Sequence, residues 1–124
     1  MLSMLADYME RGFLDNIIDM FRHDEALFPH IAELIADKQS RVRIGTIALV
    51  EELMPTHRSR IASTLPAISI GLSNLNPTIR ADVAYLMSII RDRSALQYLR
   101  MAMETEKDAA VREAMAEAID DIET

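Results

Sequence analysis

Histidine, carboxylate and hydroxyl side chains could do chemistry in this chain only if several of them met at one site. There are three histidines, His23, His30 and His57, and none is followed by Glu. No two stand at a spacing that would place both on one helix face as metal ligands. The histidines are therefore predicted to be surface or packing residues, and no metal or cofactor is expected.

The carboxylates also argue against catalysis. Glu51-Glu52 and Asp120-Asp121 are adjacent pairs, and neighbours in a helix point to different faces. A catalytic pair must instead converge on one substrate. The Ser and Thr residues lack a nucleophile elbow, and the three glycines form no phosphate-binding loop. The sequence thus predicts that the protein is not an enzyme.

Three arginines recur in matching surroundings, each preceded by a β-branched residue: Val42-Arg43, Ile79-Arg80 and Val111-Arg112. Asp37, Asn74 and Glu106 stand six residues before them. A guanidinium fork can satisfy such polar turn residues. We therefore predict a structural ladder of these six residues, Asp37, Arg43, Asn74, Arg80, Glu106 and Arg112. Anion binding by the arginines is the alternative.

The elements that position these residues are predicted to be helices, because apolar residues recur at spacings of three and four. The pattern predicts eight helices, at about residues 2–10, 13–22, 26–36, 41–53, 59–73, 77–91, 94–105 and 108–122. The connections are short, which makes successive helices antiparallel neighbours.

From each arginine, positions −1, +3, +6, +7 and +10 form one helix face, which we expect to be buried. A two-helix unit of thirty-odd residues is typical of a solenoid. The fold class predicted is therefore an all-α solenoid in one domain, 1–124. It has repeats at 26–54, 58–91 and 94–122, and an N-terminal capping hairpin at 1–24. The acidic last helix caps the other end.

The repeats resemble the HEAT repeat family. The resemblance rests on Phe28-Pro29, Asp37 and Val42-Arg43 in one copy and on Leu65-Pro66, Asn74 and Ile79-Arg80 in the next. The third copy departs from it, with Tyr98 in place of the Pro and Glu106 in place of the Asp. The resemblance implies that the second helix of each repeat lines a concave face. It also implies that the arginines join one repeat to the next.

Charge and composition narrow the possible partners. The net charge is −7, the wrong sign for a nucleic-acid binder, so no nucleic acid is expected. There is no Cys and no basic segment before the first apolar residues, which favours a cytoplasmic protein. The run Ile61 to Ile79 carries no charge but is rich in Ser, Thr, Asn and Pro. It is predicted to be a buried helix, a turn and the next helix start, not a membrane span.

The predicted function is a protein-binding scaffold or adaptor that uses the concave face. Positions +1, +5 and +8 from each arginine lie opposite the core. They are Ile44, Ala48, Glu51, Ala81, Tyr85, Ser88, Glu113, Glu117 and Asp120. An apolar strip bordered by acids suits a basic or amphipathic peptide. Two alternatives stay open: that a homodimer mate covers this face, and that the chain is an accessory subunit or a cofactor-handling, lyase-like component.

Overall fold

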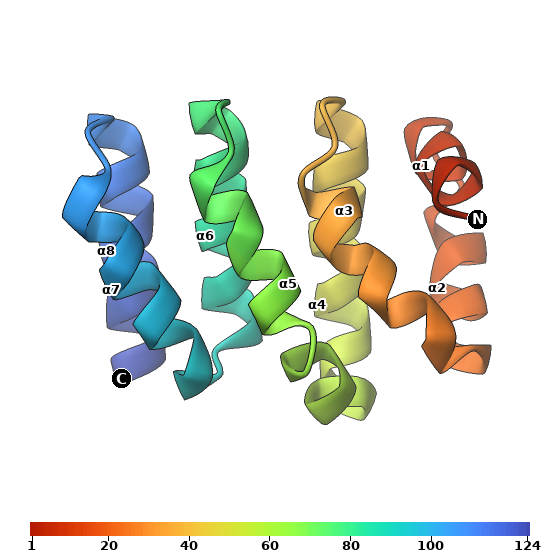
Figure 1. Ribbon diagram of the computed structural model, residues 1–124. Helices are drawn as coiled ribbons and strands as arrows, with labels where there is room; N and C mark the ends of the chain where they lie inside the picture. Colours follow the sequence, from red (N-terminus) through yellow and green to blue (C-terminus); the bar gives the residue numbers. More distant parts are fainter.

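The computed structural model describes all of residues 1–124, as helices joined by short connections and without a strand. The helical hairpins stand in a single row from one end of the molecule to the other (Figure 1). The first hairpin consists of α1 (Leu2–Glu10) and α2 (Leu14–His23), joined at Gly12 with a φ of +87°. The predicted all-α solenoid class is confirmed.

Three more hairpins follow, and the first helix of each combines an α-helix with a 3₁₀ helix, labelled η. The elements, in chain order, are η1 (Glu25–His30), α3 (Ile31–Ile35) and α4 (Ser40–Ala62); then α5 (Leu65–Ser69), η2 (Ile70–Ser73) and α6 (Pro77–Ile90); then η3 (Arg93–Ala95), α7 (Leu96–Thr105) and α8 (Ala109–Glu123).

The hairpins form two layers. Helices α3, α5 and α7 lie in front, and α4, α6 and α8 lie behind them (Figure 1). The turns that hold Asp37, Asn74 and Glu106 are all at the upper edge, and the connections between hairpins are at the lower edge. We call the exposed surface of the α3–α5–α7 layer the front face. The exposed surface of the α4–α6–α8 layer is the rear face.

The core lies between the layers and follows the register of the repeated arginines. Of the fifteen positions predicted to face inward, fourteen are buried and Ile119 is partly buried. The buried ones are Val42, Thr46, Leu49, Val50, Leu53, Ile79, Val83, Leu86, Met87, Ile90, Val111, Met115, Ala118 and Ile122. Apart from Thr46, they all belong to the single apolar cluster of the core. The positions counted from each repeated arginine therefore correctly predicted the buried face of the second helix.

Helix α4 contains the break that was predicted between residues 53 and 59. Its backbone is non-helical at His57, where φ is −130° and ψ is 29°, and Pro55 lies two residues before this kink. The difference from the prediction is that the helical segment after the kink ends at Ala62 and does not continue to residue 73. The His57 ring stacks on Phe28 and its Nδ1 lies 2.7 Å from the Thr56 hydroxyl. Residues 59–62 thus belong to α4, and α5 begins at Leu65.

Gly71 allows η2 of the front layer to approach α6 of the rear layer closely. Gly71 of η2 lies so close to α6 that a Cβ added to it would be 2.6 Å from Cγ2 of the buried Val83. Only a residue without a side chain allows this approach. The front layer of the second repeat therefore sits directly against its rear helix.

Candidate functional site

The residues considered for chemistry lie apart from one another. His23 is exposed on α2 and bonds the Asp19 carbonyl, His30 is on η1, and His57 is at the α4 kink. No group of three or more His, Cys, Asp or Glu side chains is arranged to hold a metal ion. Glu51 and Glu52 also diverge: Glu52 lines a groove between α2 and α4, and Glu51 lines another between α4 and α6.

The three repeated arginines lie at the upper edge, each bonded to its own turn. In each case Nη1 donates to the carbonyl oxygen six residues earlier in the chain. The distances are 2.7 Å from Arg43 to Asp37, 2.7 Å from Arg80 to Asn74 and 2.8 Å from Arg112 to Glu106. The arginines thus satisfy carbonyl groups that the end of the front helix leaves without a helical partner.

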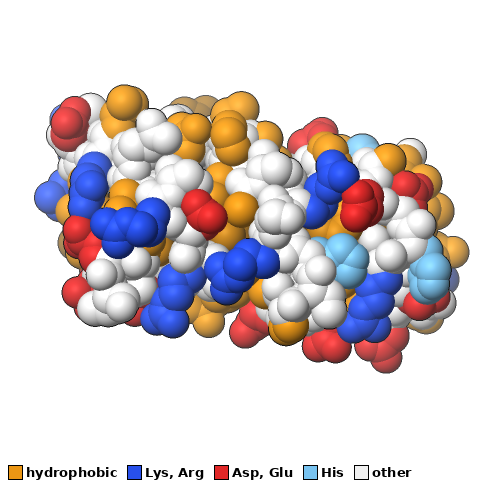
Figure 2. Space-filling view, turned by 90° about the horizontal axis from the view of Figure 1, so that it is seen from below, with side chains coloured by type: hydrophobic (Ala, Val, Ile, Leu, Met, Phe, Trp, Pro, Cys, Tyr) orange, Lys and Arg blue, Asp and Glu red, His pale blue; other side chains and the backbone are white.

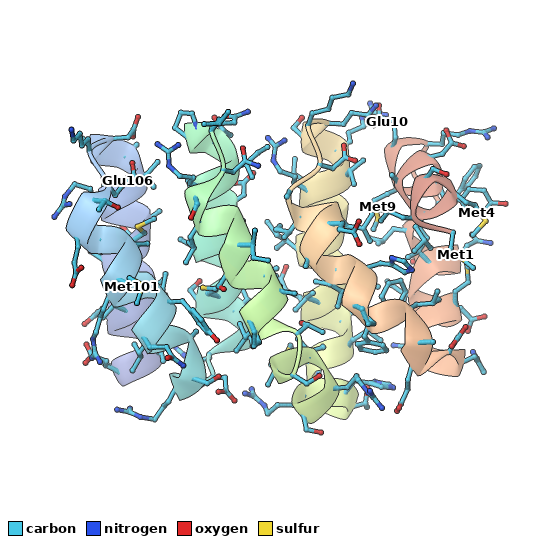
Figure 3. All side chains as sticks on the ribbon, in the orientation of Figure 1. Met1, Met4, Met9, Glu10, Met101 and Glu106 are labelled. Atoms are coloured by element: carbon cyan, nitrogen blue, oxygen red, sulfur yellow. The ribbon has the colours of Figure 1, made fainter.

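Two of these arginines also reach the next repeat. Arg43 Nε donates to Asp82 Oδ2 at 2.7 Å. Arg80 donates from Nε and Nη2 to the two carboxylate oxygens of Glu106, at 2.7 and 3.0 Å. These hydrogen bonds lower the pKa of Glu106 and raise that of Arg80. Glu106 is the labelled acid at the upper end of the last repeat (Figure 3).

The ladder differs in one respect from the predicted pairing. The Asp37 and Asn74 side chains do not accept from the arginines; each Oδ1 accepts instead from the backbone N–H two residues on, at 2.9 Å. The carboxylate that Arg43 uses is Asp82, which sequence analysis missed. Gly45 and Ala114 occupy the equivalent position in the other copies, so the repeat pattern gave it no role.

A second set of bonds joins the repeats at the lower edge and was also missed. Arg58 Nη1 donates to the Ile90 carbonyl at 3.2 Å, and Arg91 Nε donates to the Asp121 carbonyl at 3.0 Å. Arg22 likewise reaches Glu52 at 3.4 Å. Seen from below, several Lys or Arg side chains lie over the C-terminal half of this edge, and histidine side chains lie over its N-terminal half (Figure 2). The acceptors of Arg58 and Arg91 are carbonyl oxygens, so these bonds join the repeats without neutralising the two guanidinium groups.

The nine residues predicted to bind a partner are on the outer side of α4, α6 and α8. Ile44 is 65% exposed and Tyr85 is 53% exposed. Glu51, Glu113, Glu117 and Asp120 are exposed too, while Ala48, Ala81 and Ser88 are partly buried between neighbouring helices. The rear face therefore presents two large apolar side chains among acids.

A groove between α2 and α4 extends the rear face toward the N-terminus. Ala48 lies in it with Asp15, Asp19 and Glu52. The one basic residue of its lining is Arg22, whose guanidinium is paired with Glu52. The groove thus adds carboxylates to the rear face, close to the predicted apolar positions on α4.

The front face carries a second apolar surface, which sequence analysis did not predict. Ile70 is 75% exposed, Leu75 97% and Met101 69%. Met101 lies on α7, in the front layer (Figure 3). The signal for this surface was the uncharged run Ile61 to Ile79, which supplies α5 and η2 of the front layer.

Comparison of the chain with models of protein families, with curated proteins and with solved structures finds no match. None of the helices is both long enough and apolar enough to span a membrane. The uncharged run is divided between the end of α4, α5, η2 and the start of α6.

Proposed function

We propose that this chain is a non-catalytic protein-binding module of the HEAT-repeat type, and that its rear face binds a basic, amphipathic peptide segment. The observation that carries the proposal is the exposure of Ile44 and Tyr85 on a face otherwise rich in carboxylates. Apolar side chains with an aromatic residue at the centre and a charged rim are typical of binding surfaces.

The charges of the rear face support a basic partner. Asp15, Asp19 and Glu52 line the groove beside α4, and Glu113, Glu117 and Asp120 are exposed on α8. Acids at both ends of the face attract a positively charged segment and fix its register. Ile44 and Tyr85 lie between them and would contact the apolar side of that segment.

The test is fluorescence anisotropy with a synthetic helical peptide that has Leu on one face and Lys and Arg on the other. The double variant Ile44→Glu with Tyr85→Ala is compared with wild type and with Gln97→Ala, a control at an exposed residue of α7 that lines none of the grooves described. We expect the rear-face variant to weaken binding at least tenfold and the control to leave it unchanged.

Circular dichroism and Tm confirm that each variant is folded. Unchanged affinity in a folded rear-face variant would exclude this face as the binding site. Raising the salt concentration should weaken the wild-type complex, because part of its affinity comes from exposed charges.

A further inference from the structure

The front face contains two adjacent grooves. One groove lies between α3 and the α5–η2 segment, and Ala32, Ala36 and Ala67 line it. The other lies between η2 and α7, and Tyr98 and Met101 line it. Ile70 lines both, so its exposed side chain stands as a ridge between the two grooves.

The charge of these grooves differs from that of the rear face. The residues between Ile61 and Ile79, which form the centre of the front layer, include no charged side chain. Glu33 on α3 and Glu104 on α7 are the charged residues of the two linings, one in each groove, and both are exposed. The surface is therefore apolar in the middle and acidic at its two ends.

From this arrangement, the geometry points to the front face as a second docking site, for an apolar helix of a partner protein with a basic residue near each end. The site is distinct from the rear face and does not depend on the function proposed for it. Its occupant sets apolar side chains into the two grooves, one on each side of Ile70, and pairs its basic ends with Glu33 and Glu104.

The spacing of the grooves sets the spacing of the occupant's side chains. Packed helices lie about 8–10 Å apart, so neighbouring grooves of one layer are about 10 Å apart. Side chains seven residues apart on a helix are separated by roughly the same distance and lie on the same face. The occupant is therefore a helix with large apolar residues at positions i and i+7.

A second copy of this chain fits the front face less well. If two copies packed front face to front face, Glu33 and Glu104 of one copy would lie against the grooves of the other. Neither groove is lined by a Lys or Arg that could pair with them. Like charges placed opposite one another oppose association. Charge complementarity therefore favours a partner with basic ends over a homodimer.

The test uses a labelled sixteen-residue helical peptide of Ala and Gln, with two Leu residues seven apart and one Lys near each end. A matched peptide carries Glu in place of each Lys. We expect wild type to bind the Lys-ended peptide at least tenfold more tightly than the Glu-ended one. The variant Glu33→Lys with Glu104→Lys should reverse that preference, because it makes the two ends of the surface basic and leaves the apolar grooves unchanged.

A second variant tests the apolar grooves themselves. Ile70→Asp with Met101→Asp should lower the affinity for the Lys-ended peptide at least tenfold and keep the wild-type helicity, since both side chains are mostly exposed. The rear-face variant Ile44→Glu with Tyr85→Ala serves as the control and should bind as wild type does. In NMR spectra of wild type, adding the Lys-ended peptide should change the backbone amide chemical shifts of residues in α3, η2 and α7.

Four outcomes would overturn the proposal. Wild type could fail to bind the Lys-ended peptide at millimolar concentration, or the rear-face control could lose as much affinity as the Ile70 and Met101 variant. The Ile70 and Met101 variant could bind as wild type does, or the Glu33 and Glu104 variant could keep the wild-type preference for the Lys-ended peptide. A wild-type dimer in sedimentation that the Ile70 and Met101 variant dissociates would also overturn it, in favour of a second copy.

Discussion

At the scale of single residues, Arg43 and Arg112 have the same sequence surroundings and very different environments. Arg43 is 4% exposed and bonds two turn carbonyls and the Asp82 carboxylate. Arg112 is exposed and bonds the Met103 and Glu106 carbonyls. The difference follows from their contacts: Arg43 is bonded to Asp82 of the following repeat, whereas Arg112 bonds only carbonyl groups of its own repeat.

We predict that Arg43→Ala lowers the free energy of unfolding by about 2–3 kcal/mol, because it leaves the Asp82 carboxylate and two carbonyls without their donor. Arg112→Ala is the matched control and should cost less than about 1 kcal/mol, since water can reach its partners. Urea denaturation measures both. Equal losses in the two variants would contradict the role assigned to the cross-repeat bond.

Glu106 should make stability depend on pH. Its pKa is lowered below the ordinary 4.5, first by the hydrogen bonds from Arg80. In the interval between the folded pKa and 4.5 the unfolded chain binds more protons, so stability rises with pH there. The contribution is complete above the ordinary pKa and is lost as the pH falls through the folded value.

The measurement for Glu106 compares urea midpoints of wild type and Glu106→Gln from pH 7 down to pH 3. We expect wild type to be more stable at pH 7 and the difference to shrink as the pH falls below about 4.5, because protonated Glu and Gln are then nearly equivalent. A difference that stays constant over this range would show that the carboxylate charge does not contribute.

At the scale of helices, the features that recur in every repeat could be predicted from the sequence. Features that occur in only one repeat were missed. The core face of each second helix followed from the positions counted from the arginines. The break at His57 lay in the predicted gap, but the end of the following segment at Ala62 did not follow, because the apolar spacing continues through residues 61–72. Asp82 and Ile70 were missed for a related reason: each stands at a position where the repeats differ from one another.

The contact between η2 and α6 gives a prediction at this scale. Gly71→Ala should destabilise the fold by about 1–3 kcal/mol, because its Cβ would overlap the Val83 side chain. Adding Val83→Ala makes room, so the cost of Gly71→Ala should be smaller in the Val83→Ala background. A thermodynamic double-mutant cycle measures this coupling.

Gly12 provides the control for that cycle. It has a φ of +87° and no atom within 4 Å of an added Cβ, so Gly12→Ala is costly through its backbone and not through a clash. Its effect should therefore add to that of Val83→Ala. Additive effects for Gly71→Ala as well would mean that the close approach to Val83 does not limit position 71.

At the scale of the whole molecule, charge separates the surfaces that could bind a partner. The net charge is −7, and two arginines at the lower edge are paired with acids, Arg22 with Glu52 and Arg60 with Glu25. The rear face carries most of its exposed charge as carboxylates, and the centre of the front face carries none. The sequence could predict the first surface from its register, but the second needed the packing of three front helices.

This charge distribution predicts no binding to duplex DNA at physiological ionic strength. Because the net charge of −7 opposes contacts with the phosphate backbone, a labelled duplex should show no salt-sensitive change in anisotropy up to micromolar protein. A micromolar affinity that falls steeply with added salt would contradict this prediction. The basic helical peptide described above serves as the positive control.

The arginine bonds among the three repeats share a direction, whereas Arg41 donates the opposite way, to the Glu10 carbonyl of the first hairpin. Arg43 and Arg80 at the upper edge, and Arg58 and Arg91 at the lower edge, each donate to the neighbour on the C-terminal side. The middle repeat, residues 65–91, holds an acceptor and a donor at each edge: Asp82 and Arg80 above, the Ile90 carbonyl and Arg91 below. A tandem copy of this segment would therefore complete every bond with its own original. Such an insertion is expected to lengthen the row of hairpins while the arginines at both edges keep their acceptors.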